Sequence, residues 1–225
     1  ERDVLENVDF LIPITKTLNN EIDLIFNGVT KNRTVLPVGV ANKFFIKKIS
    51  PSEYDLIYSG NFSEWKGIDI LLDSLALACK IRPNLSVIFT GAYPEQKLHY
   101  EKNITQLGLD HNINFIDRTP HKEMPIIMQK ANIGVVSASY KGDGLLYTSP
   151  LKLYEYLASG LTVVAPRIPS LMSMIPEHLI HWAIPEDANS LSRAILSSLG
   201  GAGQIPVSDG VEYARKFTWA KRAEA

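Results

Sequence analysis

The sequence predicts an α/β fold in which a parallel, Rossmann-like sheet is covered by helices on both faces. Short apolar, β-branched runs alternate along the chain with longer amphipathic stretches, which is typical of consecutive βαβ units. Two of the apolar runs, DLIYSG (55–60) and LSVIFTG (85–91), end in glycine, and glycine permits a tight turn where a strand ends. With 225 residues, 45% of them hydrophobic, the chain is long enough to bury a substantial core.

The first 40 residues are expected to belong to something other than this sheet. They predict a short polar helix at 1–8, a strand at 9–15, a helix at 16–27 and a strand at 33–40. So few strands do not make a stable domain alone. We therefore expect three parts along the chain. These parts are the tail of an N-terminal domain with its linker (1–40), a Rossmann-like domain (41–210) and a C-terminal helix (211–225).

The remaining elements follow in regular alternation. Strands are predicted at 55–60, 85–91, 112–117, 132–139, 161–165 and 178–183. Helices are predicted at 66–81, 94–107, 121–130, 150–159, 168–175, 188–199 and 211–224, with loops at 140–148 and 200–210. Asp187 or Asn189 is expected near the cap of the helix at 188–199. Crossovers between parallel strands should be right-handed. Ligands of such sheets bind beyond the carboxyl ends of the strands, where the strand order reverses.

The stretch 142–165, GDGLLYTSPLKLYEYLASGLTVVA, has the marks of a helix start followed by a buried strand. Ser149 is a good N-cap residue and Pro150 suits the first helical position. Gly160 would end the helix in the left-handed conformation. A helix tip of this kind binds anions, and Glu155, one and a half turns in, could reach a group beside the anion. That pairing suits a nucleoside diphosphate, whereas the alternative is an ordinary helix with a solvated glutamate.

The spacing of residues 150–159 places them on two faces of the predicted helix. Leu151, Tyr154 and Leu157 share one face, which should be the core face. Lys152, Glu155 and Ser159 lie on another.

Composition excludes several classes of function. The net charge of -1 gives no sign of a polyanion-binding surface, so nucleic acid is not expected as a partner. The one cysteine, Cys79, cannot build a disulfide framework or a cysteine-based metal site. The five histidines show no metal-binding spacing and are interpreted as structural. No apolar run reaches the length of a membrane span. The opening ERDVLENVDF lacks a methionine, which suggests a piece of a longer chain.

Polar residues collect after the predicted strands. Gly60 and Lys66 follow the first strand of the domain, and a lysine at a helix start is more favourable when an anion lies there. The alternative is a solvated lysine. Arg118 follows the third strand and either faces the pocket or lies on the surface. Asp143, in the loop 140–148, is either a functional carboxylate or a turn residue. The first strand lacks a GxGxxG motif, which disfavours a dinucleotide dehydrogenase.

Four segments together resemble the C-terminal domain of a family 4 (group 1) retaining glycosyltransferase of GT-B fold. They are SGNFSEWKGIDILLDSLALA, LSVIFTG, NINFIDRTPHKEMPIIMQKANIGVVSAS and SPLKLYEYLASGLTVVA. The last is the most specific, because it is similar to the family's Leu-Glu-Ala-Met-Ala-x-Gly-x-Pro-Val-Val-Ala. FTWAKRAE resembles the family's terminal Phe-x-Trp helix, and VLPVGVANKFF resembles the linker between the two domains.

The resemblance implies that this chain binds a nucleotide-diphosphate-sugar donor. Lys66 matches the lysine that holds the diphosphate and is the implied catalytic residue. Glu155 matches the second glutamate of the Glu-x7-Glu motif, which binds the ribose hydroxyls. The implied donor-binding set is Gly60, Asn61, Arg118, Thr148, Ser149, Pro150, Leu151, Lys152 and Glu155. The segment 117–119 matches the region where the base is held.

Two positions depart from the family pattern. Tyr147 stands where the first glutamate of the motif is found, which affects contacts to the donor sugar. Asn61 replaces an arginine that pairs with the diphosphate, and Lys152 is a candidate substitute for that charge. The sequence SPLKLYEY resembles that of a branch of the family that is common in surface-polysaccharide synthesis.

As a whole, the resemblance implies a retaining hexosyltransferase that needs no metal or other cofactor. Its acceptor, a glycan or lipid-linked molecule, would be held mainly by an N-terminal domain, so this chain alone should bind donor without transferring sugar. The implied location is the cytoplasm, with peripheral association at the inner face of the membrane as one option for the full-length protein. Two alternatives stay open. One is another GT-B enzyme, such as a sugar-nucleotide epimerase or a phosphorylase, and the other is a non-catalytic domain that acts as a binding module.

Overall fold

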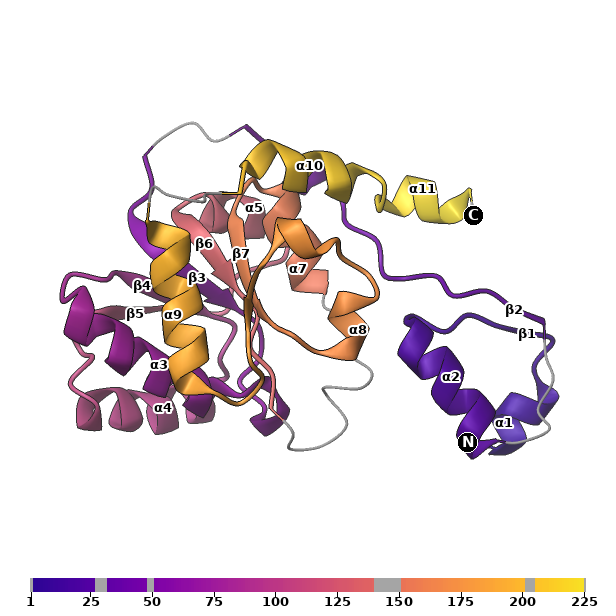
Figure 1. Cartoon of the computed structure of the whole chain (residues 1–225), viewed down its shortest axis with the longest axis horizontal. Helices are drawn as coiled ribbons and strands as arrows, with labels where there is room; N and C mark the ends of the chain where they lie inside the picture. Colours follow the sequence, from indigo (N-terminus) through magenta and orange to yellow (C-terminus); the bar gives the residue numbers. More distant parts are fainter. Residues whose placement is uncertain (1, 27–31, 48–50, 140–150, 201–204, 225) are drawn as a thin grey trace.

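A computed structural model of the chain describes residues 2–26, 32–47, 51–139, 151–200 and 205–224 (Figure 1). Its centre is a six-stranded sheet in the order β5-β4-β3-β6-β7-β8, in which all neighbouring strands are parallel. The strands are β3 (Tyr54–Ser59), β4 (Val87–Thr90), β5 (Ile113–Ile116), β6 (Ala131–Val135), β7 (Thr162–Pro166) and β8 (His181–Ala183). The predicted parallel α/β fold is therefore confirmed.

Helices cover both faces of the sheet because the strands are apolar on both sides. In β3, Leu56 and Tyr58 face one hydrophobic core while Ile57 faces the other, as the two-residue period of a strand requires. The first core contains residues of α3 (Ile68–Ile81), α4 (Pro94–Gln106) and α9 (Ala188–Leu199). The second contains residues of α5 (Met124–Met128), α7 (Leu151–Ala158), α8 (Pro169–Met172) and α10 (Val207–Arg215).

The strand order reverses between β3 and β6. From β3 the chain moves outward through β4 to β5, returns to place β6 on the other side of β3, and continues outward to β8. The pairing of Tyr54 with Ala131 and of Ile57 with Gly134 fixes the register of these two central strands. In open α/β sheets this reversal leaves a crevice at the carboxyl ends of the two strands, which is the usual place for a ligand.

A glycine in β6 holds α7 close to the sheet. A Cβ atom at Gly134 would come within 2.3 Å of the Tyr156 ring, so only glycine lets this fully buried ring lie against the strand. The Tyr156 hydroxyl accepts a hydrogen bond of 2.8 Å from the backbone N–H of Ser59, at the end of β3. Burial also raises the pKa of Tyr156. One side chain thus joins α7 to both strands of the reversal.

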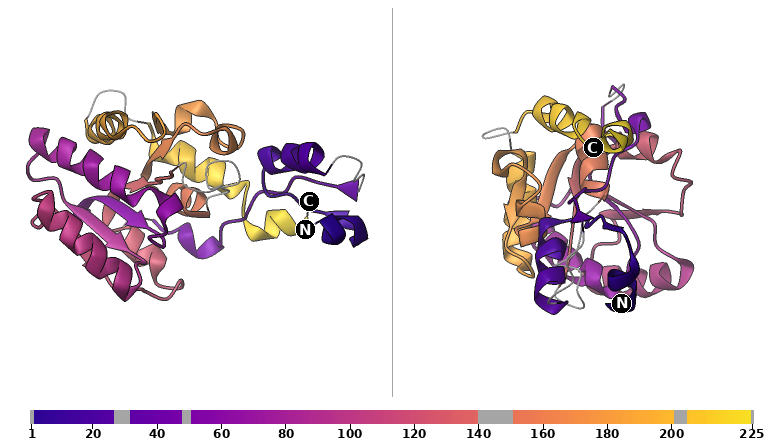
Figure 2. Two further views of the ribbon diagram at one scale, coloured as in Figure 1. Left: turned by 90° about the horizontal axis from the view of Figure 1, so that it is seen from below. Right: turned by 90° about the vertical axis from the view of Figure 1, so that its right-hand side faces the viewer.

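The N-terminal residues form a small separate unit, seen apart from the sheet in Figures 1 and 2. It contains α1 (Arg2–Asn7), β1 (Phe10–Leu11), α2 (Lys16–Ile25) and β2 (Asn32–Arg33), with β1 and β2 parallel. The predicted strands 9–15 and 33–40 are thus wrong in length. Pro13 and Pro37 lie within those ranges, and proline cannot donate to a ladder.

The linker and the C-terminus meet beside the sheet. Val40 is fully buried and pairs with Thr218 in an isolated parallel bridge. The predicted single helix 211–224 is two helices, because α10 ends at Arg215 and α11 spans Trp219–Ala223. Thr218 caps α11 by accepting from the Lys221 N–H at 3.3 Å. Since α10 begins at Val207, the predicted loop 200–210 is also shorter.

Several element boundaries differ from the prediction, while two caps agree with it. The strand expected at 178–183 begins at His181, because the 3-10 helix η3 (Glu177–Leu179) occupies its start. The strand expected at 132–139 ends at Val135. Gly160 has the predicted left-handed conformation, with φ of 72°, and Asp187 caps α9 by accepting from the Ser190 N–H at 2.9 Å.

We expect Gly134→Ala to lower the free energy of unfolding by about 2 kcal/mol, because the new methyl group overlaps the Tyr156 ring and overpacking costs about 1–3 kcal/mol. Urea unfolding of the purified chain measures this. Gly200→Ala is the matched control, since its Cβ would meet ordinary contacts of 3.6 Å or more and should change stability little. Equal stability of the two variants would contradict the tight packing of α7 on β6.

Candidate functional site

The loop after β3 is anchored at its start. The Gly60 N–H donates to the Thr90 carbonyl at 3.0 Å, and the Tyr58 hydroxyl donates to the Asn61 carbonyl at 2.8 Å. Phe62 is buried, with its ring 5.3 Å from the Tyr58 ring in an edge-on arrangement. These contacts fix the path of the chain toward Lys66.

The segment around Lys66 lies directly against the chain that follows β6. The Ser137 hydroxyl donates to the Lys66 carbonyl at 2.6 Å, and the Ser139 N–H donates to the Trp65 carbonyl at 3.0 Å. Gly67 has φ of 63°, and a Cβ there would lie 2.9 Å from the Ala138 carbonyl, so both the conformation and the contact require glycine. The loops after the two central strands therefore form one unit at the reversal.

Lys66 does not open a helix as predicted. It ends the 3-10 helix η2 (Glu64–Lys66), and α3 begins at Ile68. Its ammonium lies 3.8 Å from the centre of the Trp65 ring. Burial, and then the charge of Lys152, lower its pKa from 10.5 to about 8. Among the described residues no carboxylate lies within ion-pairing distance of Lys66.

Glu155 is buried in α7, where the side chains of Lys152 and His121 contact its carboxylate. Its side chain is 0% exposed, and the alternative of a solvated glutamate is wrong. One carboxylate oxygen, Oε2, accepts from the Lys152 ammonium at 2.6 Å, and the other, Oε1, lies 2.7 Å from His121 Nε2. A buried carboxylate is stable only with such donors. Lys152 thus pairs with Glu155, and its charge also lowers the pKa of Lys66.

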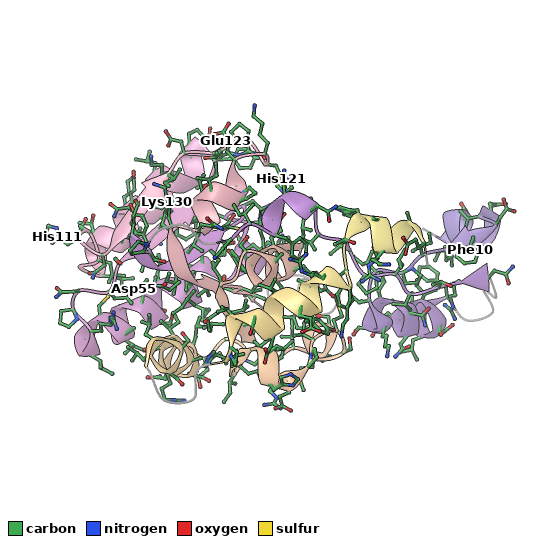
Figure 3. All side chains as sticks on the ribbon, turned by 90° about the horizontal axis from the view of Figure 1, so that it is seen from above. Phe10, Asp55, His111, His121, Glu123 and Lys130 are labelled. Carbon is green, nitrogen blue, oxygen red and sulfur yellow. The ribbon has the colours of Figure 1, made fainter. Side chains whose placement is uncertain are left out.

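His121 is the residue that sequence reasoning missed, since all five histidines were interpreted as structural. It lies in the connection from β5 to α5, beside Glu123 in Figure 3. Lys43 donates to His121 at Nδ1 (3.0 Å) and at the backbone carbonyl (2.8 Å). The available signal was its position after a predicted strand, at the same edge of the sheet as Lys66.

The structure does not bring every predicted residue to this cluster. The Arg118 guanidinium lies 4.1 Å from the centre of the Tyr93 ring, and both side chains are exposed at the ends of β5 and β4. Asn61 is exposed, and its side-chain oxygen accepts from the Ser63 hydroxyl at 3.0 Å. Within the described part of the chain, neither residue contacts Lys66 or Glu155. Their predicted roles stay predictions.

The remaining site residues lie at or before the start of α7. Leu151, the first described residue of α7, is half-buried, although its spacing placed it on the core face. Thr148, Ser149 and Pro150 lie outside the described residues, as do Tyr147 and Asp143. Their predicted roles therefore stay predictions.

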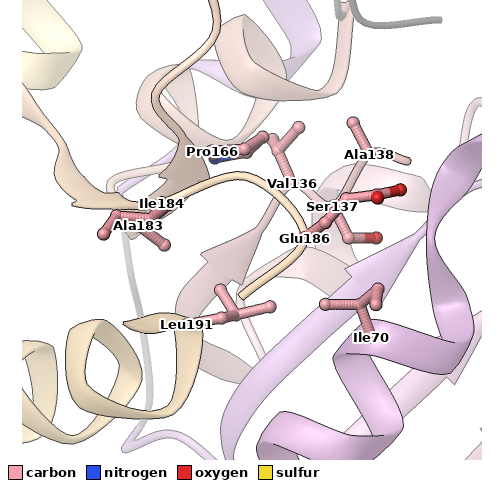
Figure 4. Close-up of a pocket in the computed structure, with 9 residues that line it drawn as sticks. All are labelled: Ile70, Val136, Ser137, Ala138, Pro166, Ala183, Ile184, Glu186 and Leu191. Carbon is pink, nitrogen blue, oxygen red and sulfur yellow. The ribbon is translucent and has the colours of Figure 1, made fainter. Parts of the chain in front are cut away.

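A narrow pocket adjoins the carboxyl ends of β6 and β8 (Figure 4). It is lined mainly by apolar residues from the chain that follows β6, from the ends of β7 (Thr162–Pro166) and β8, and from α3 and α9. Glu186, on its rim, has φ of 56°, an unusual value for a residue other than glycine. Its carboxylate accepts from the Ser139 hydroxyl at 2.6 Å. This contact ties the turn after β8 to the chain that follows β6.

No group of three or more His, Cys, Asp or Glu side chains is arranged to bind a metal ion in the described residues, 2–26, 32–47, 51–139, 151–200 and 205–224. None of the helices in those ranges combines the length and the apolar character needed to cross a membrane.

The amino-acid sequence shows which family this chain belongs to. A model of the family described as "Glycosyl transferases group 1" matches residues 40–215, so this chain belongs to the group 1 glycosyltransferases. The match spans the linker residue Val40, the six-stranded sheet and α10. The six parallel strands with helices on both faces give the Rossmann-like half of a GT-B glycosyltransferase that the resemblance implied.

Individual relatives agree with this assignment. A "D-inositol 3-phosphate glycosyltransferase" from Corynebacterium efficiens is 27% identical over 177 residues, which cover 74% of this chain and 40% of the relative. A sucrose-phosphate synthase from Thermosynechococcus elongatus superposes with a TM-score of 0.82 at 22% identity, over 99% of this chain and 58% of that one. HepE from Anabaena, solved with UDP-glucose, gives a TM-score of 0.79 at 17% identity, over 99% and 64%. This chain thus spans less than half of the first relative.

We expect Lys152→Met to raise the pKa of Lys66 from about 8, because the substitution removes a neighbouring positive charge. Burial still acts, so the pKa should stay below its ordinary value of 10.5. An NMR titration of the lysine side-chain signals measures the change. Lys97→Met is the control, because Lys97 lies in α4 and pairs with Asp117. An unchanged Lys66 titration in Lys152→Met would contradict the proximity of the two ammonium groups.

Proposed function

We propose that this chain is the donor-binding half of a retaining glycosyltransferase that takes a sugar from a nucleoside diphosphate. One observation carries the proposal. At the strand-order reversal, the ammonium of Lys66, which pairs with no carboxylate among the described residues, lies near the ammonium of Lys152, which is paired with the buried carboxylate of Glu155. Cations beside a carboxylate match a ligand in which a diphosphate adjoins a ribose diol.

The two lysines of this cluster suit the diphosphate of the ligand, and Glu155 suits its ribose. A diphosphate is attracted by ammonium groups in a partly buried site, where charges are weakly screened. Each carboxylate oxygen has two lone pairs, so Glu155, which is 0% exposed in this structure, can accept from ribose hydroxyls once the ligand draws the Lys152 ammonium away from it. The Anabaena relative HepE was solved with UDP-glucose, which supports a nucleotide-sugar as the donor class.

The proposed role of Lys66 is to stabilise the departing diphosphate. During transfer, the bond between the sugar's anomeric carbon and the diphosphate oxygen breaks, and its electron pair stays on the diphosphate. The acceptor hydroxyl oxygen bonds to the same carbon, and its proton passes to the departing diphosphate or to solvent. An ammonium placed at the developing negative charge lowers the barrier. No metal is needed in this proposal, because Lys66 and Lys152 supply the positive charge.

The acceptor and the setting belong to the proposal as well. The acceptor would be a glycan or lipid-linked molecule held mainly by an N-terminal domain, in surface-polysaccharide or glycoconjugate synthesis, as the SPLKLYEY wording suggests. Such a protein would act in the cytoplasm, where the inner face of the membrane can present a lipid-linked acceptor. This chain alone would bind donor without turnover.

A second candidate function is a non-catalytic binding module. Asn61 favours it, because its amide replaces the family's charged partner of the diphosphate and is bonded within its own loop to Ser63. Binding measurements separate the two candidates.

We expect the chain to bind one of UDP, GDP and ADP, or one of their sugar conjugates, in calorimetric titrations. Glu155→Ala should weaken that binding by about tenfold to a hundredfold, because hydrogen bonds to a charged group contribute about 1.5–3 kcal/mol. Glu123→Ala, an exposed carboxylate on the loop that also carries His121, is the control and should bind like the wild type. A folded chain with no affinity for any of these ligands would favour the binding module.

We also expect nucleotide affinity to fall about tenfold between pH 7 and pH 9. The Lys66 pKa of about 8 in the free chain leaves its ammonium mostly protonated at pH 7 and mostly neutral at pH 9. A bound diphosphate raises that pKa, so binding takes up a proton over this range and weakens as the pH rises. Lys66→Arg, which stays protonated, should abolish the dependence. The same pH slope in wild type and Lys66→Arg would exclude Lys66 as its source.

A further inference from the structure

We propose that His121 is a positioning residue for Glu155 and that Lys43 fixes the histidine tautomer this role requires. The inference rests on the proposed function, and it extends the site to a residue outside the matched motifs. Its consequence is discrimination between ribose and deoxyribose in the bound nucleotide.

The hydrogen bonds around the His121 ring allow one tautomer. The Lys43 ammonium lies 3.0 Å from Nδ1, and an ammonium can only donate. Nδ1 must therefore accept, which leaves the ring proton on Nε2. From there it is donated to Glu155 Oε1, 2.7 Å away. The chain of donors runs in one direction, from Lys43 through His121 to the buried carboxylate.

The position of the ring is fixed by packing as well. The Phe44 ring, which is fully buried, lies 5.3 Å from the His121 ring. Lys43 also donates to the His121 carbonyl at 2.8 Å, so both the backbone and the ring of the histidine are held. Lys43 and Phe44 belong to the 3-10 helix η1 (Asn42–Phe44), which follows the linker. Lys43 and His121 are 78 residues apart in the chain, so only the folded structure brings them together.

His121 becomes the more important partner once a diphosphate is bound. Lys152 holds Glu155 Oε2 at 2.6 Å, but its charge also reaches Lys66, where the diphosphate is proposed to lie. An incoming diphosphate attracts the Lys152 ammonium away from the carboxylate. The Nε2–H of His121 then remains to orient Glu155, whose free lone pairs face the ribose hydroxyls.

The test compares ribonucleotides with deoxyribonucleotides. Wild type and variants of the chain are titrated with UDP, GDP and ADP and with the 2′-deoxy and 3′-deoxy form of whichever binds. Wild type should prefer the ribonucleotide at least tenfold over one of the deoxy forms. His121→Leu should lose about tenfold in affinity for the ribonucleotide and little for that deoxy form. His121→Gln, whose amide N–H can replace Nε2–H, should restore most of the preference.

Two further variants sharpen the comparison. Lys43→Met should weaken the preference for ribose in part, because the tautomer is no longer imposed. His111→Leu is the matched control at the far end of the sheet, as Figure 3 shows, and should retain the wild-type preference. About half of the His121 side chain is exposed, so its replacement leaves the core filled, and thermal unfolding of each variant verifies this.

The outcomes separate the inference from the proposed function. Equal losses for ribonucleotide and deoxynucleotide in His121→Leu would show a structural role only, and an unchanged preference would exclude any role. Either result overturns the inference while the nucleotide site stands. Wild type that binds none of the nucleotides overturns the proposed function, and the inference with it.

Discussion

The burial of the Glu155 carboxylate is the constraint that organises this site. A charged group removed from water must be matched by donors, or the fold pays several kcal/mol. The donors are Lys152 on the same helix and His121 from the connection before α5, and Lys43 in η1 in turn donates to His121. The carboxylate therefore constrains how α7, that connection and η1 approach one another.

The fold could be predicted from sequence because its determinants are local and repetitive. Apolar runs that alternate with amphipathic stretches indicated the parallel sheet, and Gly160 and Asp187 marked their helix ends correctly. Boundaries failed where tertiary contacts decide them. The break between α10 and α11 is set by the pairing of Val40 with Thr218, two segments whose proximity no local pattern indicates.

The site was predictable only in part. The sequence indicated that Glu155 and Lys152 lie together because they share a helix, and that Lys66 lies at the same edge because it follows a strand of the predicted sheet. The contact of His121 with Glu155 could not be predicted, since it joins residues 34 positions apart in the chain. Nor could the sequence reveal that Arg118 stacks on Tyr93, because rotamer and neighbour together decide where a long side chain lies.

The strand-order reversal has a consequence for how the protein is made. Synthesis from the N-terminus delivers β3, β4 and β5 first, and these neighbours can pair as soon as they emerge. Lys66 belongs to this early half, whereas Glu155 belongs to the half that follows β6. The two charges meet only after β6 docks beside β3 and Tyr156 seats against Gly134. The site is therefore complete only when both halves of the domain are in place, and a ligand that spans it would brace these early and late halves against separation.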